Sequence, residues 1–189
     1  MIRPIVLYGH PVLRKKAQPV EDFEEAKRLI ADMFETMHNA RGIGLAAPQV
    51  NVLKQIFVVD TAQLAEGYDD NEMPLGTPIK KAFINPQIIE LSGKPIVYEE
   101  GCLSIPDVRA NVERPFKVLI RHQDENGQWH EEEYDGLTAR VIMHEYDHLQ
   151  GKLFIDYLSP LKKQLLSSKL KNIQRGKVKP FYPVLVSNR

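Results

Sequence analysis

The sequence predicts an α+β fold, and three observations support this prediction. Apolar runs of strand type recur through the middle of the chain. Two of them flank Asn126-Gly127, a pair typical of a tight hairpin turn. Helical periodicity precedes and follows the strand-like runs.

The first predicted helix begins after Asp22, which forms a capping box with Glu25, and extends to about Met37. Strand-like runs follow at residues 55–60, 82–90, 94–99, 108–113, 116–124 and 128–134. Between the first two runs, residues 61–78 are rich in acids, glycine and proline. This segment is expected to be an exposed loop.

Two further helices are expected in the second half of the chain. One begins at Asp135, a capping residue type, and ends at Gly151. The other has Ser159 as its cap and Pro160 at its first position, and it ends near Gly176.

The most informative motif is H-E-x-x-H at residues 144–148. Positions i and i+4 of a helix lie on one face, so His144 and His148 can direct two imidazoles at one metal ion. Glu145 lies beside them as a candidate proton carrier for hydrolysis. The alternative is a surface helix that carries these residues by chance, so a metal site needs a third ligand.

Several residues are candidates for that third ligand. One zinc-protease pattern continues to a third histidine, but Phe154 occupies that position. Asp156 lies downstream, and His122, His130 and the single cysteine, Cys102, lie upstream. A lone cysteine is most often a small buried hydrophobe. However, two imidazoles and one thiolate leave the fourth position of a tetrahedral site open, as catalytic sites require.

A glycine-rich segment at residues 42–49 reads G-I-G-L-A-A-P-Q. It fits the dinucleotide-binding pattern G-x-G-x-x-A, but it follows a predicted helix instead of a strand. Pro48 also falls where the next helix should run. The glycines are better explained as places where backbone approaches an extended ligand, and Gln49 offers an amide donor at the end of the segment.

Three segments together resemble the signature motifs of bacterial-type peptide deformylase. They are residues 42–49, the E-G-C-L-S of residues 100–104 and the H-E-Y-D-H of residues 144–148. They occur in the family's order, and the resemblance extends from about Ile5 to the helix after Ser159. The family fold has antiparallel β-sheets packed around a central H-E-x-x-H helix, with a C-terminal helix. One departure is the stretch 61–78, which is longer than in compact members.

The resemblance implies a metal-dependent hydrolase that removes the formyl group from the N-terminal formylmethionine of newly made polypeptides and releases formate. The implied metal ligands are Cys102, His144 and His148. The implied cofactor is one Fe²⁺ per chain, which Ni²⁺, Co²⁺ or Zn²⁺ can replace. Glu145 corresponds to the catalytic glutamate, and Gln49 and the backbone N–H of Leu103 correspond to the oxyanion stabilisers.

The methionine side chain of such a substrate needs an apolar slot. Our candidates are Ile43 and, one and two turns before the first histidine of the motif, Val141 and Leu137. Each is alternatively plain core, Leu137 most of all. Gly44 and Gly101 are expected to let substrate backbone pair with the protein in extended form.

Composition is consistent with one catalytic domain over residues 1–189, because 189 residues, 43% of them hydrophobic, can build a full core. A single cysteine excludes a disulfide framework and fits a reducing compartment. No apolar run approaches a membrane span, and residues 1–4 begin neither a signal nor a transit peptide. We therefore expect a cytoplasmic protein with no membrane or DNA partner.

Charge is unevenly distributed, although the net charge is zero. No acidic residue follows Asp156, so the helix and tail at about 159–189 are basic. The basic residues there are Lys162, Lys163, Lys169, Lys171, Arg175, Lys177, Lys179 and Arg189. Such a tail suggests an anionic partner, and the resemblance suggests the ribosome; the alternative is a solvated helix face. Leu161, Leu165 and Ile173 are expected to pack this helix on the body.

Two other functions are compatible with the sequence. An H-E-x-x-H endopeptidase would use Asp156 or His122 as its third ligand and would keep its metal without Cys102. A non-catalytic module would bind ribosomal RNA through the basic tail and would hold no metal.

Overall fold

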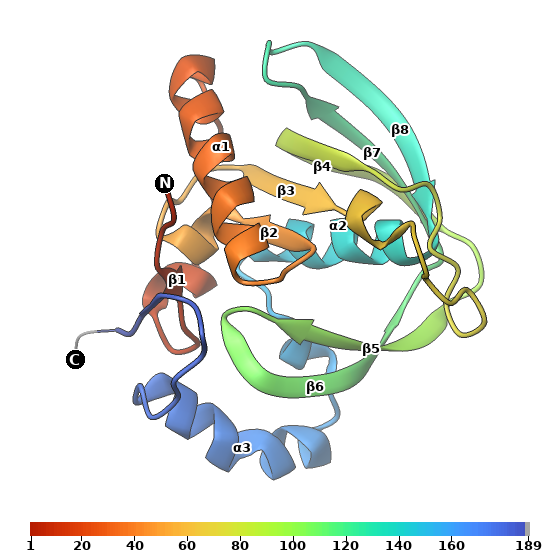
Figure 1. The fold of residues 1–189 in the computed structure, drawn as a ribbon. Helices are drawn as coiled ribbons and strands as arrows, with labels where there is room; N and C mark the ends of the chain where they lie inside the picture. The colour runs from red at the N-terminus through yellow and green to blue at the C-terminus, as the bar shows by residue number, and fades with distance from the viewer. Residues whose placement is uncertain (188–189) are drawn as a thin grey trace.

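The largest element of the fold is a five-stranded antiparallel sheet (Figure 1). The structure, a computed structural model, describes residues 1–187. The strand order is β2-β3-β4-β7-β8. The strands are β2 (Gly44–Ala46), β3 (Ile56–Asp60), β4 (Lys80–Ser92), β7 (Lys117–Gln123) and β8 (Trp129–Asp135).

Two smaller sheets accompany it. Strands β5 (Ile96–Cys102) and β6 (Ile105–Arg114) pair antiparallel as a long hairpin. Strands β1 (Ile5–Val6) and β9 (Val184–Leu185) pair parallel, so the two ends of the described chain lie side by side (Figure 1).

Three α-helices pack around these sheets. They are α1 (Phe23–Asn39), α2 (Gly136–Leu149) and α3 (Pro160–Gln174). Short 3-10 helices occupy Pro11–Arg14, Ala47–Val50, Ala62–Leu64 and Phe154–Tyr157. Helix α2 lies between the five-stranded sheet and the β5–β6 hairpin, whereas α3 lies on the outside (Figure 1). The predicted α+β fold with antiparallel sheets around a central helix is therefore confirmed.

Every predicted strand is present, with ends displaced by a few residues. The predicted hairpin joins β7 and β8, and Gly127 has the positive φ (+77°) that its turn requires. The sequence missed β2, because its three residues belong to the glycine-rich segment that gives no strand pattern. It also missed β1 and β9, whose two residues each are too short for a periodicity.

The N-terminus of α2 is capped by a distant loop, which corrects two expectations. Asp135 occupies the cap position, but its side chain makes no capping hydrogen bond. Instead, Leu137 N–H donates to the carbonyl of Pro74 at 2.8 Å, and Thr138 N–H donates to that of Leu75 at 3.0 Å. The loop 61–78 is therefore not simply exposed: Leu75 is buried, and the loop fixes the start of the helix.

The packing of α3 differs from the prediction. Leu161 and Leu165 are 66% and 73% exposed, so the expectation that they pack on the body was wrong. Ile173 is buried as expected, together with Leu170. Ser159 does cap the helix, with its hydroxyl accepting from Lys162 N–H at 3.3 Å. Within residues 1–187, no helix combines the length and the apolar character needed to cross a membrane.

Candidate active site

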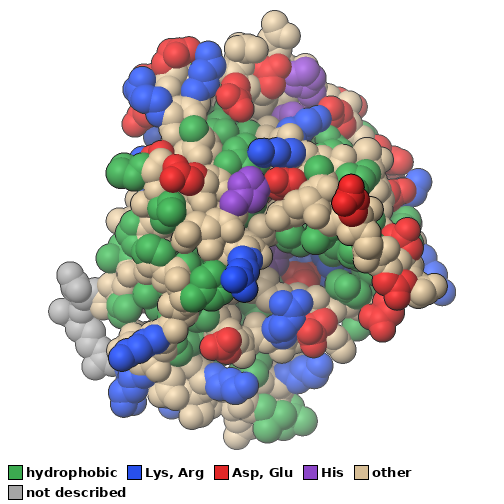
Figure 2. Space-filling view, in the orientation of Figure 1, with side chains coloured by type: hydrophobic (Ala, Val, Ile, Leu, Met, Phe, Trp, Pro, Cys, Tyr) green, Lys and Arg blue, Asp and Glu red, His purple; other side chains and the backbone are tan. Residues whose placement is uncertain are grey.

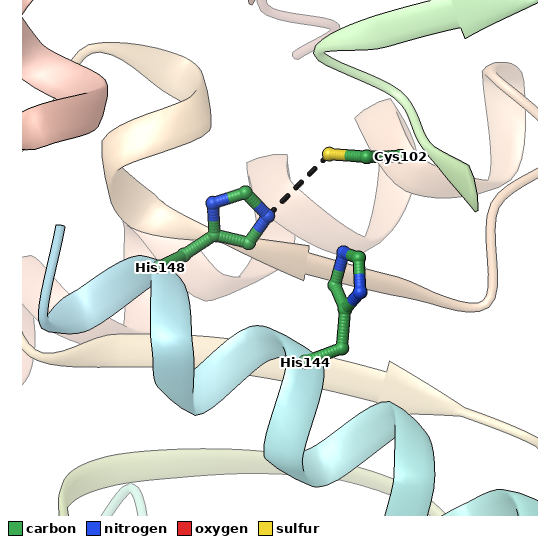
Figure 3. A group of neighbouring side chains, drawn as sticks. All are labelled: Cys102, His144 and His148. Carbon is green, nitrogen blue, oxygen red and sulfur yellow. Dashed lines mark hydrogen bonds between the residues drawn. The ribbon is translucent and has the colours of Figure 1, made fainter. Parts of the chain in front are cut away.

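Three side chains from two elements converge on one point. Cys102 ends β5, and His144 and His148 stand one turn apart on α2, all directed toward one another (Figure 3). The Sγ of Cys102 lies 3.4 Å from Nε2 of His148. One ligand atom from each of the three residues falls within 4.8 Å of the others.

The other third-ligand candidates lie elsewhere. Asp156 pairs with Arg14 at 2.7 Å. His122 contacts Glu132 at 2.9 Å, and His130 contacts Asp124 at 2.7 Å. Among residues 1–187, Cys102, His144 and His148 form the single group of three metal-binding side chains. The geometry therefore gives no support to the endopeptidase ligand sets.

The three side chains are suited to a divalent transition metal. A thiolate and two imidazoles are ligands of tetrahedral zinc and related ions. His144 Nδ1 contacts the carboxylate of Glu100 at 2.9 Å, which leaves Nε2 directed at the cluster. Glu145 Oε2 is buried without a hydrogen-bond partner among the described residues, as a group awaiting a ligand or water would be.

Glu100 is the centre of a buried charge network that sequence reasoning missed. Its two carboxylate oxygens accept from Arg114 at 2.6 and 3.0 Å and from Arg140 at 2.6 Å. Arg114 also donates to Asp147 at 2.9 Å. Glu100 is part of the E-G-C-L-S segment, so its place beside Cys102 was the available signal. The arginines are charged residues in a strand and a helix, which usually face solvent.

The pKa values of His144 and His148 are shifted in opposite directions. Burial alone would lower the pKa of His144, but hydrogen bonds with Cys102 and Glu100 outweigh it and raise that pKa well above its usual value. Burial lowers the pKa of His148, and the neighbouring charge of His144 lowers it further. Burial also raises the pKa of Glu145 to about 7, against the opposing charge of His144. A carboxyl group with such a pKa exchanges a proton near neutral pH.

Gln49 lies inside this cluster. Its side chain is 1% exposed, and its Oε1 accepts from the backbone N–H of Ala46 at 2.9 Å. Its Nε2 donates to Cys102 Sγ at 3.4 Å and to Ser104 Oγ at 3.2 Å. The amide N–H groups are therefore oriented toward the thiol, and the carbonyl is held by the backbone. The backbone carbonyl of Leu103 accepts from the hydroxyl of Tyr182 at 2.8 Å.

A cavity of about 580 Å³ opens over these side chains, within the size range of ligand sites. It is visible as a hollow with basic side chains at its edge (Figure 2). Its lining includes Cys102, His144, Glu145, Gln49 and Leu103, and also the predicted pocket residues Ile43, Gly44, Gly101, Leu137 and Val141. The predicted site residues therefore line one space, except for His148, which is 1% exposed and is not part of the lining.

The two predicted glycines allow protein side chains to approach closely. A Cβ on Gly44 would lie 2.6 Å from Glu145 Oε1, and one on Gly101 would lie 2.8 Å from Nη1 of Arg109. Gly44 belongs to β2, one of the two edge strands of the large sheet, and Gly101 belongs to β5, which forms a two-stranded sheet with β6. Two sheet edges thus border the cavity.

The fold and this cluster define a class of protein, a metallohydrolase whose catalytic helix is enclosed by antiparallel sheets. The polypeptide deformylase family model matches residues 2–164. The chain is 54% identical over 177 residues to the peptide deformylase of Cytophaga hutchinsonii, covering 93% of this chain and 92% of the relative. It is 49% identical over 191 residues to that of Christiangramia forsetii, covering 100% and 97%.

Solved structures agree. A peptide deformylase from Legionella pneumophila superimposes with a TM-score of 0.80 at 39% identity, covering 94% of this chain and 98% of that one. The enzyme from Thermus thermophilus gives 0.81 at 38% identity, covering 93% and 99%. The chain belongs to the polypeptide deformylase family, metallohydrolases that remove N-formyl groups from nascent polypeptides.

Proposed function

We propose that Cys102, His144 and His148 hold one Fe²⁺ and that this centre hydrolyses the formyl group of N-formylmethionyl peptides. A divalent ion held by these three side chains would supply Lewis-acid chemistry, which lowers the pKa of water toward neutrality. Ni²⁺, Co²⁺ or Zn²⁺ can replace the iron. The observation that carries this proposal is the convergence of the three donor side chains with Glu145 and a cavity.

Glu145 is the proposed general base and acid. Its carboxylate takes a proton from the attacking water and returns it to the amine that leaves the formyl carbon. The Oε2 atom of Glu145 is buried and free of other hydrogen bonds among residues 1–187, so it is available for this transfer. The products are formate and a peptide with a free amino terminus.

Two donors are proposed to stabilise the negative charge that develops on the formyl oxygen. They are the amide of Gln49, fixed by the hydrogen bond that its Oε1 accepts from Ala46 N–H, and the backbone N–H of Leu103, a residue that lines the same cavity. A preorganised donor of this kind typically contributes about 2.7–4 kcal/mol to transition-state stabilisation.

The methionine side chain is proposed to enter the apolar part of the cavity formed by Ile43, Val141 and Leu137. Gly44 and Gly101 belong to the two strands whose edges border the cavity. An extended peptide can add to such an edge through main-chain hydrogen bonds. The formyl carbon bears a hydrogen atom where larger acyl groups bear a carbon chain. A narrow site therefore accepts the formyl group and excludes larger acyl groups.

The test is release of formate from formyl-Met-Ala-Ser by protein reconstituted anaerobically with Fe²⁺. We expect turnover with Fe²⁺ or Ni²⁺ and loss of the Fe²⁺ activity in air, because ferrous iron and a thiolate both oxidise. An enzyme that is fully active with Zn²⁺ and gains nothing from Fe²⁺ would contradict the iron assignment. Absence of formate release with every metal would contradict the function.

We also propose that residues 1–189 act as one catalytic domain in the cytoplasm and that the basic helix and tail from about 159 dock it on the ribosome. The described basic side chains of this segment are exposed, and Arg189 lies outside the described residues. Reversal of Lys162, Lys163, Lys169 and Lys171 to Glu should weaken salt-dependent co-sedimentation with ribosomes. Co-sedimentation that survives the reversal would contradict the docking role.

A further inference from the structure

An aromatic side chain stands at the mouth of the active-site cavity, on the segment that follows α3. Phe181 lines the cavity and is 66% exposed. It lies beyond residues 2–164, the part of the chain that the family model matches. Exposure of one apolar side chain is ordinary on a protein surface. What distinguishes Phe181 is its position on the rim of a catalytic cavity and the way it is held there.

Its neighbour Tyr182 anchors the segment. Tyr182 is 8% exposed and belongs to the apolar core shared with α1. Its hydroxyl donates to the carbonyl of Leu103 at 2.8 Å, and the carbonyl of Pro183 accepts from Ile5 N–H at 2.9 Å. The backbone that follows the Phe181 ring is therefore fixed to the body of the protein.

The ring itself is oriented by two neighbours. The guanidinium carbon of Arg41 lies 5.0 Å from its centroid, within cation–π range. The Tyr182 ring lies 5.3 Å away at 85°, in an edge-to-face arrangement. Arg41 directly precedes the glycine-rich segment and lines the same cavity. A ring that is already oriented loses little conformational entropy when it binds a ligand.

We propose that Phe181, positioned by Arg41 and Tyr182, forms a subsite for a side chain that follows the formylmethionine of the substrate. This proposal rests on the proposed function, in which the substrate is a polypeptide that must leave the cavity across its rim. Pro180 and Leu103 also line the cavity, so the surroundings of the ring are apolar as well as basic. The subsite favours an aromatic or aliphatic side chain at the second or third residue of the peptide.

The experiment compares formyl-Met-Phe-Ala and formyl-Met-Ala-Phe with the same peptides carrying Gly in place of Phe. For the unmodified protein we expect kcat/KM to be roughly three- to tenfold higher with Phe at one of the two positions, the range of one aromatic pair. This ratio should fall to about one in Phe181→Ala and be retained in Phe181→Tyr. Calorimetric titration with deformylated Met-Ala-Phe and Met-Ala-Gly gives a second readout that requires no turnover.

Trp129→Ala is the matched control, because Trp129 is also an exposed ring (45%) with an arginine, Arg121, stacked at 4.5 Å. It lies on β8 outside the cavity lining, so the ratio should not change.

A ratio near one in the unmodified protein, or a higher ratio that is retained in Phe181→Ala, overturns the subsite alone. Peptides with Asp in place of Phe are assayed in parallel, and a preference for Asp that is unaffected by Phe181→Ala overturns the subsite in favour of charge recognition by Arg41. Failure to cleave any of these peptides overturns the proposed function as well.

Discussion

Helices α2 and α3 are similar in length, with 14 and 15 residues, but they are held in opposite ways. In α2 only Tyr146 and Asp147 are not buried, whereas in α3 only Leu170 and Ile173 are. The start of α2 is capped by carbonyls of the distant loop 61–78, whereas α3 is capped by its own Ser159.

The two helices therefore differ in what determines their position: tertiary contacts for α2 and local sequence signals for α3. Helix α2 is placed by tertiary contacts, so changes on it or on its supporting loop should affect both catalysis and stability. Helix α3 is specified by local signals and leaves most of its surface to solvent, so changes on it should affect neither strongly.

Glu145→Gln should reduce kcat by roughly 10²- to 10⁴-fold, because it removes the proposed base and leaves the side-chain shape. Formate release under saturating substrate measures this. The control on α3 is Ser168→Ala, an exposed position, which should leave kcat unchanged. Retention of turnover by Glu145→Gln would remove Glu145 from the mechanism.

Gln49→Leu is nearly isosteric and removes one proposed oxyanion donor. We expect kcat to fall by roughly 10²- to 10³-fold with little change in KM, the pattern of an interaction made only in the transition state. Steady-state kinetics on formyl-Met-Ala-Ser measure kcat and KM for both proteins. A large rise in KM at constant kcat would instead assign Gln49 to substrate binding.

Gly76→Ala should destabilise the protein by disturbing the cap of α2. A Cβ at Gly76 would lie 2.2 Å from the carbonyl oxygen of Asp135. Gly67→Ala is the control, because Gly67 has the same φ of +76° but no atom within 4 Å of the place that an added Cβ would take. The clash should cost about 2 kcal/mol beyond the control, which is roughly 4–8 °C in Tm. Equal melting temperatures for the two variants would show that the loop does not constrain α2.

Ser159→Ala should have the smallest effect. It removes the cap of α3 at a cost of about 1 kcal/mol and roughly 2–4 °C in Tm, with kcat unchanged. Thermal melts and the formate assay measure both. A loss of turnover comparable with that of Gln49→Leu would end the distinction between the two helices.

The sequence predicted the ends of α3 but not which of its faces packs on the body. The positions of its leucines explain this. Leu161 and Leu165 are four residues apart, as Leu166 and Leu170 are, so two apolar stripes compete. The second stripe continues to Ile173, and it is this longer one that packs. Which stripe faces the body depends on the tertiary arrangement, which local periodicity does not contain.

The sequence predicted those residues of the candidate site that lie close together along the chain. His144, Glu145 and His148 share one helical turn, and the predicted helix was found. Cys102 was one of several candidates until the β5–β6 hairpin placed it against α2. Arg114 and Arg140 were not predicted, because only the folded structure shows that both donate to buried Glu100. Phe181 was missed for the same reason: its position on the cavity depends on a segment returning from α3.

The metal content of three purified proteins shows whether Cys102, His144 and His148 form the metal centre. Reconstituted with Fe²⁺ under anaerobic conditions and analysed by mass spectrometry, the unmodified chain should hold one ion per chain. Glu145→Gln should hold the same amount, because it removes no ligand, whereas Cys102→Ala should hold little or none. Full occupancy in Cys102→Ala would contradict the assignment of Cys102, His144 and His148 as the metal centre.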